Sequence, residues 1–158
     1  MTATASGNET QTFTIREEIL VRASIDKTFA SLIAQLGPYN ETTDGQPLSM
    51  VIEPHPGGRW YRDLGGDNGH LWGFVQSIKR PVLLEFWGPL FISSGATSNL
   101  QYRLSEVADG TLITFTHSVV GPFPEDHRAG LGTGWAAIHE RVKLGAEAAD
   151  KQEGSTSR

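Results

Sequence analysis

Four polar side chains fall within apolar patterns of the sequence: Glu17, Arg62, His117 and His139. Burying such a group without a partner costs about 1 to 3 kcal/mol, so each of them needs a partner or a function. If they converge, they can anchor a ligand carbonyl or carboxylate, or transfer a proton, because an ordinary histidine titrates near pH 6.5. We take these four as candidate catalytic residues. The competing interpretation is that each is satisfied structurally, at a strand end or in an internal ion pair.

Aromatic residues are dense in the same segments, where they either fill the core or line a ligand cavity. Three of them, Trp60, Tyr102 and Trp135, combine an expected inward direction with a polar atom. The candidate ligand-binding residues are Trp60, Arg62, Phe74, Phe86, Tyr102, Phe115, His117, Trp135 and His139.

Other kinds of chemistry are poorly supported by the sequence. His55, Asp63, Asp67 and His70 are close in sequence, but their spacing fits no standard metal-ligand motif. The run from Gly130 to Gly134 has no lysine at the phosphate-loop position and is predicted to make the entrance of a helix flexible, as a gate. No Gly-x-Ser-x-Gly motif and no cysteine occur. We therefore expect neither a metal nor a cofactor.

Composition limits the class of protein and its partners. A chain of 158 residues with 38% hydrophobic and 20% charged residues fits one globular domain. The formal charge of −5, with scattered Lys and Arg, argues against nucleic acid as a partner. No apolar stretch of about 18 residues predicts a membrane span, and the first residues do not have the pattern of a signal peptide. Together with the lack of cysteine, this predicts a cytoplasmic protein.

The first elements are a strand and a short helix. Apolar residues alternate with polar ones from Phe13 to Val21, which predicts a half-buried strand. Ser24 or Asp26 can then cap a helix that Gly37-Pro38 ends. The apolar residues of that helix follow i, i+3, i+4, i+7 spacing: Phe29, Leu32, Ile33 and Leu36.

Successive hairpins and a long helix are predicted next. Strand patterns occupy 48–53, 59–64, 70–78, 82–88, 97–105 and 111–120. The turns between them include Gly65 to Gly69 and Asp109-Gly110. A helical stripe follows: Leu131, Trp135, Ile138, Val142, Ala146 and Ala149. This order predicts an α+β domain over 12–149, with flexible tails at 1–11 and 150–158.

Several segments together resemble the SRPBCC superfamily, and more narrowly the activator of heat-shock-protein-90 ATPase homologues. They are Ala23-Ser24, the Pro-Gly-Gly-containing segment from Glu53 to Trp60, Gly69 to Val75, and Gly134-Trp135, and the likeness covers about 12 to 145. The resemblance implies a helix-grip fold: a curved antiparallel sheet of about six to seven strands wrapped around a long C-terminal helix, with a short helix after the first strand. Members usually carry tryptophan just after the first helix, whereas this chain has none between Leu36 and Glu41.

Three functions follow from these expectations. The first is binding of a small hydrophobic molecule, a lipid or an aromatic polyketide-like compound, between the sheet and the C-terminal helix. The second is a cyclase or aromatase that uses the four polar candidates on such a substrate. The third, implied only by the family resemblance, is a chaperone-associated interaction module. Exposed strand edges also allow a homodimer.

Overall fold

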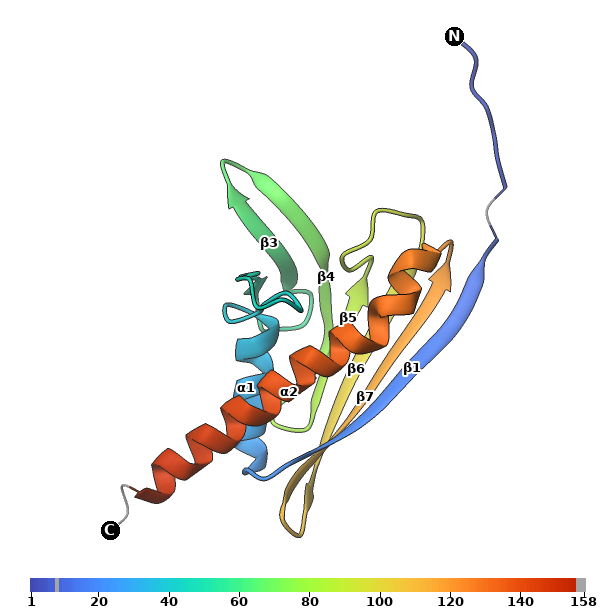
Figure 1. Ribbon diagram of the computed structural model, residues 1–158. Helices are drawn as coiled ribbons and strands as arrows, with labels where there is room; N and C mark the ends of the chain where they lie inside the picture. The colour runs from blue at the N-terminus through green and yellow to red at the C-terminus, as the bar shows by residue number, and fades with distance from the viewer. Residues whose placement is uncertain (8, 156–158) are drawn as a thin grey trace.

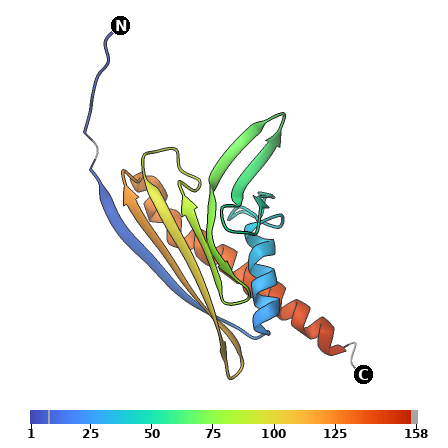
Figure 2. The same ribbon diagram turned by 180° about the vertical axis from the view of Figure 1, so that it is seen from behind.

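The computed structural model describes residues 1–7 and 9–155, which form one curved antiparallel sheet and two helices (Figures 1 and 2). The elements are β1 (Gln11–Val21), α1 (Ile25–Leu36), β2 (Val51–Ile52), β3 (Arg59–Gly65), β4 (Asn68–Lys79), β5 (Leu83–Gly88), β6 (Thr97–Val107), β7 (Gly110–Gly121) and α2 (Glu125–Ser155). The sheet order is β1-β7-β6-β5-β4-β3-β2. The helix α2 runs diagonally across the concave face, and α1 packs beside it. The predicted α+β helix-grip fold is confirmed.

The helix α1 forms where the capping pattern predicted it. The Ser24 side chain accepts a hydrogen bond from the backbone nitrogen of Lys27 at 3.3 Å, and Gly37 follows the last helical residue. Its Ser31 hydroxyl donates to the carbonyl of Val142 in α2 at 2.7 Å. A Cβ at Gly145 would lie 2.8 Å from that hydroxyl oxygen, so the glycine permits the close approach of the two helices.

The alternation of strand residues places the polar candidates on the concave face. One inward row of paired residues runs across the sheet through Val75, Phe86, Leu100, His117 and Ile15. The neighbouring inward row contains Tyr102, Phe115 and Glu17. Both rows face α2, because Phe115 contacts Trp135 of that helix. The period-two pattern therefore delivers Glu17 and His117 to the region beneath the helix.

A bulge between β3 and β4 changes which residues face inward. Trp60 pairs with Gly73 and Tyr61 pairs with Leu71, so Trp72 is an extra residue on β4. Trp72 is buried, whereas Phe74 stacks on Trp87, which is 52% exposed, on the opposite face of the sheet. Phe74, a predicted ligand-binding residue, therefore points away from α2.

Close contacts between backbone atoms hold the Pro-Gly-Gly turn that precedes β3. Gly57 has a φ of 80° and donates a hydrogen bond to the Val75 carbonyl at 2.8 Å. A Cβ at Gly58 would lie 1.9 Å from the carbonyl oxygen of Glu53. The turn therefore requires glycine at position 58 for steric reasons.

We expect Gly58→Ala to lower the free energy of unfolding by about 2 kcal/mol or more, because the backbone must shift to relieve this overlap. Urea denaturation measures the change. Gly132→Ala is the matched control: its Cβ would meet nothing within 4 Å, and alanine favours the helix by about 0.5 to 1 kcal/mol. Equal unfolding midpoints for wild type and Gly58→Ala would show that the turn tolerates a side chain.

The last helix is longer at both ends than the sequence predicted. It begins at Glu125 and includes the run from Gly130 to Gly134, which was predicted to precede the helix as a flexible entrance. Burial of Leu131 and Trp135 outweighs the low helix propensity of these glycines. The helix also continues to Ser155, into the predicted tail, whose residues 156–158 lie outside the described residues, as does residue 8 of the first tail. No helix in the described part of the chain is long and apolar enough to cross a membrane.

Candidate functional site

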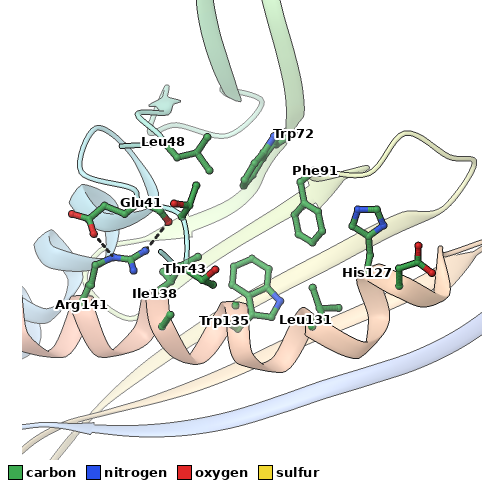
Figure 3. Close-up of a pocket in the computed structure, with 15 residues that line it drawn as sticks. Glu41, Thr43, Leu48, Trp72, Phe91, His127, Leu131, Trp135, Ile138 and Arg141 are labelled. Carbon is green, nitrogen blue, oxygen red and sulfur yellow. Dashed lines mark hydrogen bonds and ion pairs between the residues drawn. The ribbon is translucent and has the colours of Figure 1, made fainter. Parts of the chain in front are cut away.

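A cavity of about 430 Å³ lies between the first half of α2, the loop that follows α1 and the loop between β5 and β6 (Figure 3). Its walls are mainly apolar: Leu48, Trp72, Phe91, Leu131, Trp135 and Ile138. The size is within the range of small-molecule sites, and the composition is typical of them.

Three aromatic side chains from different parts of the chain line the cavity. Two of them form the wall opposite α2, and the third belongs to α2 itself. Trp72 contacts Phe91 edge to face, with ring centroids 5.7 Å apart, and contacts the buried Trp60 at 5.1 Å. The loop that carries Phe91 is tied to the sheet because the Leu90 nitrogen donates to the Trp72 carbonyl at 2.8 Å. Trp135 reaches the cavity from α2. The bulge turns Trp72 inward, and Trp72 thereby forms the sheet side of the cavity wall.

Polar groups gather at the two ends of the cavity. At one end, Arg141 of α2 donates from Nη2 to the carbonyl oxygen of Glu41 at 3.0 Å. Its Nε lies 4.0 Å from the Glu41 carboxylate and is buried without a hydrogen-bond partner. At the other end Figure 3 shows His127, and the adjacent residue Asp126, in the first turn of α2, also lines the cavity. The cavity is therefore mainly apolar along its length, where Thr43 adds a hydroxyl beside Ile138 and Trp135, and carries charged side chains toward its ends.

Glu17, His139 and Tyr102 form one hydrogen-bonded network in the core. The His139 Nδ1 lies 2.8 Å from the Glu17 carboxylate, and its Nε2 lies 3.1 Å from the Tyr102 hydroxyl. Burial lowers the pKa of His139, although Glu17 acts in the opposite direction. Burial and the charge of Glu17 raise the pKa of Tyr102, so the phenol keeps its proton and donates it to Nε2. All three polar groups are satisfied within the network.

Trp135, His117 and Ser98 form a second network. The Trp135 indole nitrogen donates to His117 Nδ1 at 3.1 Å. Because indole is a donor only, Nδ1 must be the unprotonated nitrogen, and Nε2 donates to the Ser98 hydroxyl at 2.9 Å. Burial lowers the pKa of His117 to about 4. His117 is therefore held neutral in a fixed tautomer.

Trp135 separates these networks from the cavity. Its ring stacks on His139 with an angle of 13° between the planes and contacts Phe115 behind it. Glu17, His117 and His139 are not among the residues that line the cavity. Arg62 is only partly buried and lies on the β3–β4 hairpin opposite His70, apart from both networks. Three of the four catalytic candidates therefore converge, but beneath the site rather than in it.

The aromatic candidates divide in the same way. Of the predicted ligand-binding set, Trp135 lines the cavity. Trp60 is buried behind Trp72 and donates its indole hydrogen to the Leu36 carbonyl at 2.9 Å. Phe86, Tyr102 and Phe115 are fully buried core residues. These core residues support the cavity from behind.

Some cavity residues were missed at the sequence level. Arg141 continues the helical stripe three residues after Ile138, and a cation at the edge of an apolar stripe was a usable signal. Phe91 comes from an irregular loop, where periodicity carries no information. Leu48 was predicted to begin a strand over 48–53, but only Val51–Ile52 pair with β3, so Leu48 lies in the loop before β2.

No protein-family model matches this sequence, and neither does any of the curated proteins with which it was compared. Solved structures do match. An uncharacterised protein from Rhizobium leguminosarum has a TM-score of 0.67 at 17% identity, with 90% of this chain and 99% of that chain covered. Ara h 8.0201 has a TM-score of 0.62 at 13% identity, with 87% and 99% covered.

A third likeness is to the di-domain ARO/CYC protein StfQ from the steffimycin biosynthetic pathway. The TM-score is 0.60 at 10% identity, with 87% of this chain and 51% of that chain covered. At these identities the likenesses establish the fold alone, and it is the helix-grip fold that the sequence resemblance implied. The narrower resemblance to the activators of the heat-shock-protein-90 ATPase stays a prediction.

Proposed function

We propose that this protein binds a small hydrophobic molecule in the cavity between α2 and the sheet. The observation that carries the proposal is the cavity of about 430 Å³, walled by Trp72, Phe91 and Trp135, with charged and polar side chains also in its lining. Such a site provides apolar area for affinity and a few polar atoms for orientation. The likeness to StfQ, a di-domain ARO/CYC protein of a biosynthetic pathway, supports a small-molecule role for this fold.

A cyclase or aromatase is the alternative that the likeness to StfQ favours. A general acid or base must come within hydrogen-bond reach of the reacting group, directly or through one water. His117 and His139 use both ring nitrogens within the buried networks, and Trp135 lies between them and the cavity. Catalysis by these residues would require Trp135 to move, so binding is the better-supported function. The chaperone-associated module has no support in the site.

The direct test is titration with N-phenyl-1-naphthylamine, a neutral aromatic probe that fluoresces in apolar sites. We expect saturable binding with one site per chain and a dissociation constant on the order of 10 µM, which is ordinary for a ligand of that size. Fluorescence titration gives the affinity, and native mass spectrometry gives the number of bound molecules.

Exposed aromatic surface is the main competing location for such a probe. Trp87 is 52% exposed and stacks on Phe74 on the outer face of the sheet. Trp87→Ser removes that surface without touching the cavity, and we expect it to leave the affinity unchanged. Loss of binding in this variant, or no saturable binding in the wild type, would contradict the proposed function.

A further inference from the structure

The Arg141 guanidinium carries an unused hydrogen-bond donor at the wall of the cavity. Arg141 is only 20% exposed, and its Nε is the one buried side-chain nitrogen or oxygen without a hydrogen-bond partner among residues 1–7 and 9–155. Buried donors are nearly always paired, because an unpaired one loses its water without replacement. Because Arg141 also lines the cavity, its incompletely paired guanidinium is a candidate partner for an acceptor on a ligand.

The neighbouring carboxylate does not fill this role. Glu41 Oε2 lies 4.0 Å from Arg141 Nε, beyond hydrogen-bond distance, and the backbone carbonyl of Glu41 takes the Nη2 hydrogen instead. The Glu41 side chain is 43% exposed, while hydrogen bonds from Leu48 to Asn40 and from Met50 to Gly37 hold its loop in place. The carboxylate can therefore turn toward solvent while the cavity wall stays fixed.

The charges at the two ends of the cavity favour one orientation of a bound molecule. Asp126 at the far end repels an anion, whereas a guanidinium presents a planar fork of donors that matches a carboxylate or sulfonate. Between these ends the wall is aromatic and aliphatic, and Figure 3 shows Trp135, Phe91 and Trp72 along that stretch. This arrangement favours a ligand that places an aromatic ring along the apolar stretch and an acidic group at Arg141.

We infer that the ligand is an aromatic acid: a ring system held by Trp72, Phe91 and Trp135, with an anionic group that accepts hydrogen bonds from Arg141 in place of the Glu41 carboxylate. This inference rests on the proposed function, since it names the class of molecule bound in the same cavity.

The test compares two probes that share one ring system, N-phenyl-1-naphthylamine and its anionic analogue 1-anilinonaphthalene-8-sulfonate. Both are titrated in the Trp87→Ser background, so that the outer aromatic surface does not compete. In Arg141→Gln we expect the sulfonate to bind about tenfold more weakly, while the neutral probe changes less than about twofold. In Glu41→Gln we expect the sulfonate to bind about threefold more tightly, because the competing negative charge is gone. Lys143→Gln, which removes one charge of α2 outside the cavity wall, should change neither probe.

The outcomes separate this inference from the proposed function. If neither probe binds, the proposed function fails and the inference falls with it. If both probes bind but Arg141→Gln weakens them equally, the inference is overturned and hydrophobic binding stands. Arg141 also holds the Glu41 carbonyl, so circular dichroism must show that the variant is folded. If it is not, Glu41→Gln decides the question, and unchanged sulfonate affinity there overturns the inference.

Discussion

Replacing Gly134 by leucine is expected to weaken binding of N-phenyl-1-naphthylamine by about tenfold or more while leaving the protein at least as stable as the wild type. Gly134 lines the cavity, and a Cβ built there meets nothing within 4 Å. A leucine side chain would occupy the space that the probe needs, and overpacking of about 1 to 3 kcal/mol corresponds to a loss of this size. Helix propensity favours leucine over glycine, which is why stability should not fall.

The same substitution two residues earlier is the matched control. Gly132 also has open space around it, but it is exposed and outside the cavity wall. Gly132→Leu should gain similar helix propensity and bind the probe like the wild type. Fluorescence titration and thermal unfolding of both variants measure the two effects. Full affinity in Gly134→Leu would mean that the probe binds elsewhere, and the cavity would lose its assigned role.

Lowering the pH from 7 to 4 is expected to reduce the free energy of unfolding by about 3 kcal/mol through His117 alone. Its pKa is about 4 in the folded protein, against 6.5 when it is exposed in the unfolded chain. Between these values the unfolded state binds the proton and the folded state does not, so stability falls as the pH falls from 6.5 toward 4. Well above pH 6.5 the histidine is neutral in both states and has no effect.

His117→Gln isolates this contribution. The glutamine amide can accept from Trp135 and donate to Ser98, as the neutral histidine does, but it does not titrate. We expect the variant to lose about 3 kcal/mol less than the wild type over the same pH range, measured by urea denaturation. His139 also has a lowered pKa and acts in the same direction in both proteins. Parallel pH profiles of wild type and variant would contradict the neutral, buried state of His117.

The elements were predictable because their signals are local. The alternation in β1, the serine cap of α1 and the glycine turns each depend on residues that are close in sequence. The start of α2 was not predictable in this way, since the glycines from Gly130 to Gly134 disfavour a helix locally. Burial of Leu131 and Trp135 in the tertiary structure favours the helix there and offsets the low propensity of the glycines.

Only part of the site could be inferred from the sequence, because which side chains meet depends on the tertiary structure. Periodicity placed Glu17, His117 and His139 on inward faces, and the structure satisfies them in two buried networks that meet at Trp135. It could not show that Trp135 lies between them and the cavity. A single extra residue at Trp72 reversed the alternation on β4, turning Trp72 inward and Phe74 outward.

The central claim is that the cavity beside Trp135 and Phe91 holds a hydrophobic ligand, and a crystal structure of the protein with N-phenyl-1-naphthylamine tests it most directly. We predict that the naphthalene ring lies between these two side chains, with the rest of the fold unchanged. An empty cavity with the probe stacked on Trp87 at the outer face of the sheet would contradict it.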